Sequence, residues 1–71
     1  MIYNESATTL SPAVQQVIEQ GAANMGASEP LRVEEPFEDE DVDGLFYVPV
    51  YEYESGEFLF NVNLETEQIQ A

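Results

Sequence analysis

Carboxylates dominate the charge of this chain. Its 71 residues include 15 Asp and Glu but only one Arg, no Lys and no His, which gives a formal net charge of −14. Repulsion among so many like charges destabilises any compact state. A fold therefore needs a substantial core, and 44% of the residues are hydrophobic. That content is too high for a chain that stays disordered. The sequence predicts a folded polyanion, and its length suffices for a single domain over residues 1–71.

The negative charge also restricts the partners of such a protein. A polyanionic surface repels nucleic acid and anionic membranes, and it attracts cationic clefts, to which association is accelerated by ~10–10³-fold. We therefore expect a basic protein as partner, with no direct binding of nucleic acid or membrane. Without Cys the chain forms no disulfide, and its first residues lack the features of a signal peptide. This combination predicts a cytoplasmic protein.

One amphipathic helix is predicted in the first half of the chain. Ser11-Pro12 is typical of a helix start, because Ser caps a free backbone N–H and Pro lacks the N–H that would go unpaired at the first position. Apolar and small residues then recur at spacings of three and four, which draws one stripe along the helix. These residues are Val14, Val17, Ile18, Gly21 and Met25. We expect the helix to end near Ala23.

The rest of the chain favours strands. Apolar and polar residues alternate from Leu31 towards Pro36, again over residues 45–53 and again over residues 57–63. Ser55-Gly56 joins the last two as a tight hairpin, and Pro49 indicates a bulge or an unpaired edge position. Shorter strands are expected at Ile2-Tyr3 and Gln68-Ile69. The predicted class is α+β: one main helix packed on a small, mostly antiparallel sheet, forming a two-layer sandwich.

Catalysis is difficult to build from this set of residues. His, Cys and Lys are absent, so Ser or Thr would lack the base that activates them. A carboxylate pair is the remaining option, and no pair stands among apolar residues that would raise one pKa selectively. We expect no enzymatic activity and no cofactor.

The segment Asp39-Glu40-Asp41-Val42-Asp43-Gly44 matches the first half of an EF-hand calcium loop. The twelfth position, where a bidentate Glu closes the cage, is Val50, and a strand is predicted after the Gly instead of a helix. We therefore expect no dedicated metal site. Weak binding of divalent ions by a solvated acidic loop stays open.

Residues 34–43 hold seven carboxylates in ten positions. In an extended chain, alternate side chains lie ~6.6 Å apart on one side. DNA carries one phosphate per ~3.4 Å on each strand, and its backbone contacts dominate the affinity of DNA-binding proteins. This segment is thus a candidate mimic of a phosphate row, and its partner-binding acids would be Glu38, Asp39, Glu40, Asp41 and Asp43.

A resemblance to a known family extends over nearly the whole chain. The run Ile2-Tyr3-Asn4-Glu5-Ser6, then Leu10, Val14 and Val17-Ile18, resembles the start of the phage uracil-DNA glycosylase inhibitors. The register resumes at Leu31-Arg32-Val33, continues through Phe37, the acidic segment and Leu45-Phe46-Tyr47-Val48, and ends at Ile69.

This resemblance implies a monomer that inhibits uracil-DNA glycosylase in a 1:1 complex, in the cytoplasm of an infected bacterial host. Glu5 and Ser6 would stand in for phosphates of the target DNA strand. An apolar cavity between helix and sheet would receive an apolar side chain of the enzyme. Its lining would be Val14, Val17, Ile18, Val33, Phe46 and Val48.

Two other hypotheses remain beside this one. An acidic DNA mimic could inhibit another DNA-binding protein, such as a restriction, CRISPR or nucleoid protein. The charge could also belong to a calcium-binding module or to a salt-adapted proteome, with no mimicry. Charge alone does not separate the first of these from a glycosylase inhibitor.

Overall fold

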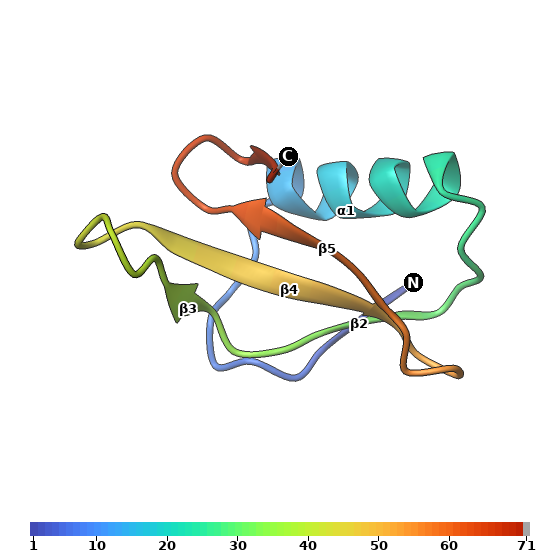
Figure 1. Cartoon of the computed structure of the whole chain (residues 1–71). Coiled ribbons are helices and arrows are strands. Elements are labelled where there is room, and N and C mark those ends of the chain that lie inside the picture. Colours follow the sequence, from blue (N-terminus) through green and yellow to red (C-terminus); the bar gives the residue numbers. More distant parts are fainter. Residues whose placement is uncertain (71) are drawn as a thin grey trace.

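The structure, a computed structural model, describes residues 1–70 and has one helix on one side of a twisted sheet (Figure 1). This arrangement confirms the α+β class. Within these residues the only parallel strand pair is β1–β2, and the other pairs are antiparallel. The sheet order is β1-β2-β4-β5-β6, and β3 also pairs with β4. The elements are β1 (Ile2–Asn4), α1 (Pro12–Asn24), β2 (Leu31–Val33), β3 (Phe37–Glu38), β4 (Phe46–Glu52), β5 (Phe58–Asn63) and β6 (Gln68–Ile69).

The helix begins where the sequence predicts. Ser11 is the N-cap, and its hydroxyl accepts a hydrogen bond from the Val14 N–H at 3.1 Å. The same hydroxyl donates to the Glu67 carboxylate at 2.9 Å, which ties the turn between β5 and β6 to the start of the helix. At the other end α1 reaches Asn24, one residue beyond the predicted end. Gly26 follows in the left-handed conformation that ends many helices.

The core lies between α1 and the sheet. Val48 pairs with Val62 and Val50 pairs with Phe60 across β4 and β5, so these four side chains form the floor. Helix residues Val14, Ile18 and Ala22 pack on them, together with Leu31 and Val33 of β2. Burying each such aliphatic side chain contributes roughly 1.5–3 kcal/mol. No polar or charged residue among residues 1–70 is buried. The core is therefore purely apolar.

Pro49 lies inside β4 without breaking it. The carbonyl of Pro49 accepts from the Glu34 N–H at 3.3 Å, just past the end of β2 and before β3 begins. A residue without an N–H fits here, because neither strand continues opposite it. On its other side Pro49 pairs with Asn61 of β5, and β4 is an interior strand, so the predicted unpaired edge position is wrong. The irregularity in the ladder falls one step later, between Val50 and Tyr51, where Leu59 is the extra residue on β5.

The sequence missed β3. Phe37 and Glu38 lie in the acidic segment, where no strand is predicted, yet the chain pairs with β4 directly after Pro36. The short strands β1 and β6, predicted on few residues, are present. Within residues 1–70, no helix is long and apolar enough to cross a membrane.

Gly21 provides a test of how closely the helix approaches the sheet. A Cβ placed on Gly21 would lie 2.5 Å from Ile69 Cδ1 and 2.9 Å from Phe60 Cζ. We expect Gly21→Val to lower the free energy of unfolding by about 1–3 kcal/mol through overpacking. Ala23→Val, at an exposed position of the same helix, is the control and should cost only about 0.6 kcal/mol. Helix propensity alone predicts that Gly21→Val is the more stable of the two variants. Chemical denaturation of both variants therefore distinguishes overpacking from helix propensity.

Candidate functional site

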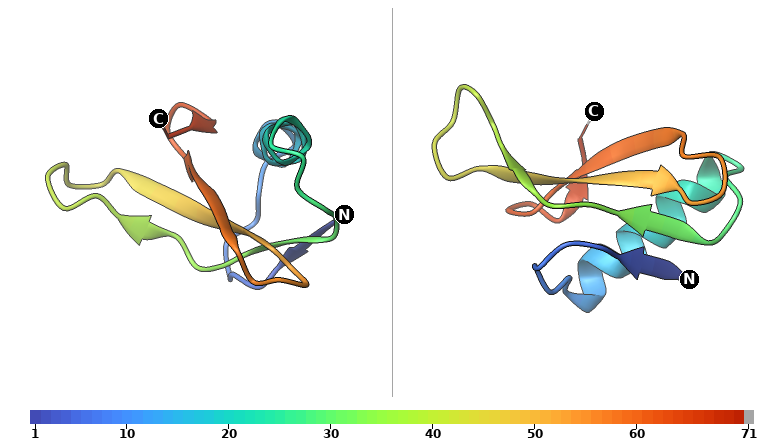
Figure 2. Two further views of the ribbon diagram at one scale, coloured as in Figure 1. Left: turned by 45° about the vertical axis from the view of Figure 1, so that its right-hand side comes forward. Right: turned by 90° about the horizontal axis from the view of Figure 1, so that it is seen from below.

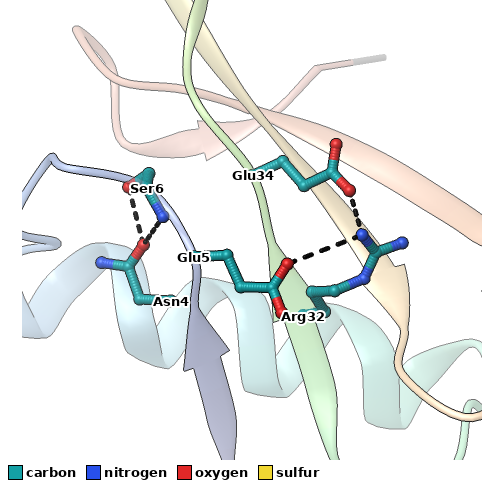
Figure 3. Close-up of polar contacts among 5 residues, drawn as sticks. All are labelled: Asn4, Glu5, Ser6, Arg32 and Glu34. Atoms are coloured by element: carbon teal, nitrogen blue, oxygen red, sulfur yellow. Dashed lines mark hydrogen bonds and ion pairs between the residues drawn. The ribbon is translucent and has the colours of Figure 1, made fainter.

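None of the 15 Asp and Glu side chains, all within residues 1–70, is buried. The only Arg or Lys in the chain, Arg32, lies on β2 between the core residues Leu31 and Val33, and therefore on the sheet face that points away from the helix. It forms ion pairs with Glu34 and, at 3.8 Å, with Glu5 (Figure 3). Its guanidinium also lies 4.5 Å from the ring centre of Tyr51. The single Arg is thus held by two carboxylates and an aromatic ring. The N-terminal ammonium of Met1 pairs with Glu29 at 2.8 Å, and the remaining acids have no Lys or Arg to pair with.

Glu5 and Ser6 are neighbours with different roles. The Glu5 carboxylate, half exposed, reaches across to Arg32 on the open sheet face. Ser6 turns the other way: its N–H and its hydroxyl both donate to Asn4 Oδ1, at 2.9 and 2.6 Å (Figure 3). The Ser6 hydroxyl also accepts from the Thr8 N–H at 3.2 Å. Ser6 therefore shapes the turn after β1, and Glu5 is the more accessible of the two predicted binding groups.

The acidic segment is not the extended row that its sequence predicts. Pairing with β4 ends at Glu38, and the chain then bends through a turn before Phe46. The cause is local hydrogen bonding. Asp39 Oδ1 accepts from the N–H groups of Asp41 and Val42, at 2.7 and 3.0 Å. A short polar side chain bonded to the backbone two residues on is a typical turn former.

Two of the five predicted binding acids in this segment are used to build the turn. Glu38 accepts from the Gly44 N–H at 2.7 Å, and Asp39 Oδ2 accepts from the Tyr47 hydroxyl at 2.8 Å. Glu40, Asp41 and Asp43 are exposed on the turn. The accessible charge of the acidic loop, which we define as residues 39–44, is therefore carried mainly by these three side chains.

The apolar residues expected to line a cavity between helix and sheet do not do so as a set. Val14, Ile18, Val33 and Val48 are at most 3% exposed, because they are the packed core itself. Val17 is half-buried at the edge of that core. Val17 lines a recess of about 370 Å³ between α1 and β6, and Phe46, which is 40% exposed, lines a different pocket at the end of the sheet. The six residues do not line one shared cavity, because four of them are packed against one another in the core and the other two line separate pockets.

The pocket beside Phe46 lies at the end of the sheet near the acidic loop. It has a volume of about 530 Å³, within the range of roughly 300–1,000 Å³ typical of ligand-binding pockets. Glu35 and Glu65 provide carboxylates there, and Glu35 also accepts from the Ala7 N–H at 2.6 Å. Sequence reasoning found Phe46 but missed the others. The lining consists of Thr8, Glu35, Pro36, Gly44, Phe46, Leu64 and Glu65.

The calcium-loop pattern does not assemble ligands. Both carboxylate oxygens of Asp39, the first position of the pattern, already accept hydrogen bonds from the protein. Within residues 1–70 no group of three or more acidic side chains is placed to hold a metal ion.

Comparisons of the chain with protein-family models, with curated proteins and with solved structures gave no match.

The contacts of Arg32 predict that this residue contributes measurably to the stability of the fold. We expect Arg32→Gln to lower the free energy of unfolding by about 1 kcal/mol, because Glu5 and Glu34 lose their shared cation and the contact with Tyr51 is removed. Arg32→Lys is the matched control, since it keeps the charge but not the planar, stacked group. Urea unfolding should rank the proteins as wild type, then Lys, then Gln. A Gln variant as stable as wild type would contradict the contribution.

The acidic loop predicts a transition at low pH. The N–H of Asp41, followed by the Tyr47 hydroxyl, holds the pKa of Asp39 below its ordinary value, and the same Tyr47–Asp39 bond raises the pKa of Tyr47. A lowered carboxyl pKa contributes stability that is present above the unfolded value of about 3.9, and this contribution is lost as the pH falls through the folded pKa. NMR shifts of the Asp41 and Val42 amides should therefore titrate together in acid.

Asp39→Asn is the control for this titration, because its amide oxygen still accepts the backbone bonds but carries no titrating proton. The acid transition of the two amides should vanish in this variant. An unchanged transition would assign the titration to another group.

Proposed function

We propose that this protein is an acidic inhibitor that occupies the DNA-binding groove of a basic DNA-processing enzyme, with uracil-DNA glycosylase as the first target to test. The observation that supports this most directly is the charge: 15 carboxylates, none buried, against one Arg that two of them already engage. Such a surface fits a groove built to hold phosphates. It does so without any chemistry, so inhibition would be by occupancy.

The dimensions of the molecule are compatible with this role. Its principal extents are 33 × 22 × 21 Å, and one turn of B-DNA is about 34 Å long. One copy therefore spans about the length of duplex that a small DNA-binding enzyme contacts. Carboxylates on this body would pair with the Arg and Lys side chains that normally bind phosphates.

The choice of glycosylase rests on the resemblance around Glu5 and Ser6. Glu5 is half exposed and available to a partner, whereas Ser6 supports the turn that presents it. An apolar side chain of the enzyme would find no opening at Val14, Ile18, Val33 or Val48. The pocket at Phe46 is an apolar recess that lies close to the acidic loop. In this proposal it takes the place of the interior cavity.

A uracil-excision assay tests the proposal. Titration of the protein against a bacterial uracil-DNA glycosylase should inhibit the enzyme at equimolar amounts, and inhibition should weaken as salt screens the charges. Glu5→Gln should weaken inhibition by about tenfold or more if Glu5 is desolvated in the complex. Glu19→Gln, which removes the same charge from the exposed face of α1, is the control and should inhibit like wild type.

Loss of inhibition in both variants alike would show that only total charge matters. If wild type does not inhibit at stoichiometric amounts, glycosylase is discarded as target. DNA mimicry is then tested separately, by asking whether duplex DNA displaces host proteins that this chain captures from a bacterial lysate.

A further inference from the structure

Aromatic side chains gather on the sheet face that points away from the helix. The register fixes their side: Val48 and Val50 of β4 face α1, so the alternate residues Tyr47 and Tyr51 face the other way. The view from below in Figure 2 (right) looks onto this face, with α1 behind the strands. Six of the eight Phe and Tyr belong to it: Tyr3, Phe37, Tyr47, Tyr51, Tyr53 and Phe58.

These six rings form three pairs, two between neighbouring strands and one between Tyr3 of β1 and Tyr53 in the turn after β4. Their centres are 4.8 Å apart in Tyr3–Tyr53, 5.6 Å in Phe37–Tyr47 and 5.7 Å in Tyr51–Phe58. Tyr3, Phe37, Tyr53 and Phe58 are 42–50% exposed, and no other element among residues 1–70 covers this side of the sheet. In a two-layer fold this side is usually polar. A contiguous apolar patch on it is typical of an interaction surface.

Arg32 shows which chemistry this face accommodates. Its guanidinium lies over Tyr51 and between the carboxylates of Glu5 and Glu34. Stacking on an aromatic ring combined with ion pairing is the environment that a guanidinium prefers and that an ammonium fits less well. The outer rings at Tyr3, Tyr53 and Phe58 are open, and Glu54 and Glu57 are exposed beside them in the chain. These rings and carboxylates offer a second guanidinium the same combination of an aromatic ring and an acidic partner.

Charge decides between the possible occupants. Nucleic-acid bases also stack on aromatic rings, but their phosphates would approach a protein of net charge −14. A second copy of the chain would bring another −14 to the same surface. A protein surface that carries arginine complements both the rings and the surrounding acids.

We propose that the aromatic face, defined as Tyr3, Tyr53, Tyr51 and Phe58 with Arg32 at its centre, is a docking surface for arginine side chains of the basic partner. The inference deepens the proposed function, on which it rests for the partner's identity. Carboxylates elsewhere supply attraction to any cation, and this face selects arginine over lysine.

The test uses two synthetic nonapeptides of equal charge, one of arginine and one of lysine, titrated into the full-length protein and followed by calorimetry and by NMR of the aromatic rings. Because a planar guanidinium can stack on a ring and pair with a carboxylate at once, which an ammonium does less well, the arginine peptide should bind about fivefold tighter or more. The preference should persist at high salt, where the attraction common to both peptides is screened. Ring resonances of Tyr3, Tyr53 and Phe58 should shift with arginine.

The variant Tyr3→Leu/Tyr53→Leu keeps the net charge and an apolar surface but removes two ring faces. Its arginine preference should fall clearly below that of wild type, because only Tyr51 and Phe58 of the face remain, with core methyl resonances unchanged as evidence of an intact fold. Met25→Ala, at an exposed apolar residue on the helix layer, is the control and should keep the arginine preference.

Equal affinity of wild type for the two peptides, or ring shifts confined to residues outside the aromatic face, would overturn the inference. So would self-association through this face, or its binding of a single-stranded oligonucleotide. The uracil-excision assay tests the proposed function independently of the peptide titrations. An arginine preference without glycosylase inhibition would support the docking surface and contradict glycosylase as the target. Inhibition without an arginine preference would support the target and contradict the docking surface.

Discussion

The contact between the β4–β5 pair and α1 is what the other features of this chain depend on. The paired side chains Val48 with Val62 and Val50 with Phe60 provide the surface on which the helix packs. This small core must outweigh both the chain entropy and the mutual repulsion of a net charge of −14. It contains no polar residue that would need compensation. The close approach at Gly21 brings the helix to within contact of Phe60 and Ile69, which leaves no cavity of the expected kind.

A chain with one Arg and no Lys satisfies its carboxylates in another way. Backbone N–H groups and hydroxyls take the place of cations: Glu35 accepts from Ala7, Glu38 from Gly44 and Glu52 from Ser28. The Ser55 hydroxyl and the Ser28 N–H together lower the pKa of Glu52. Through these two bonds Glu52 connects the β4–β5 hairpin to the loop after α1. Several acids are thus structural and cannot all serve a partner. The charge available for recognition is smaller than the composition indicates.

Local signals predicted most of the fold. Ser11-Pro12, the helical spacing of apolar residues and the Ser55-Gly56 turn gave the helix and the main hairpin with nearly correct ends, because each is set by residues close in sequence. Features that depend on contacts between residues far apart in the sequence were not predicted. β3 depends on Phe37 meeting Tyr47 across a loop, and the closure of the helix on the sheet depends on Gly21. The prediction of an extended row of carboxylates was also wrong. It assumes a straight backbone, whereas the hydrogen bond from the Asp41 N–H to Asp39 bends the chain into a turn.

The same limit applies to the candidate site. Sequence alternation in β4 separates Val48 and Val50 from Tyr47 and Tyr51, but alternation alone does not show which set the helix covers, and only the family resemblance placed Val48 on the helix side. Once α1 takes the valine side, the tyrosines are left uncovered together with the only Arg. An uncovered aromatic surface has a cost in solubility, and a net charge of −14 offsets that cost by keeping copies apart. Charge and aromatic face are therefore complementary: the charge excludes other anions and copies of the same chain, and the rings discriminate among the cations that remain.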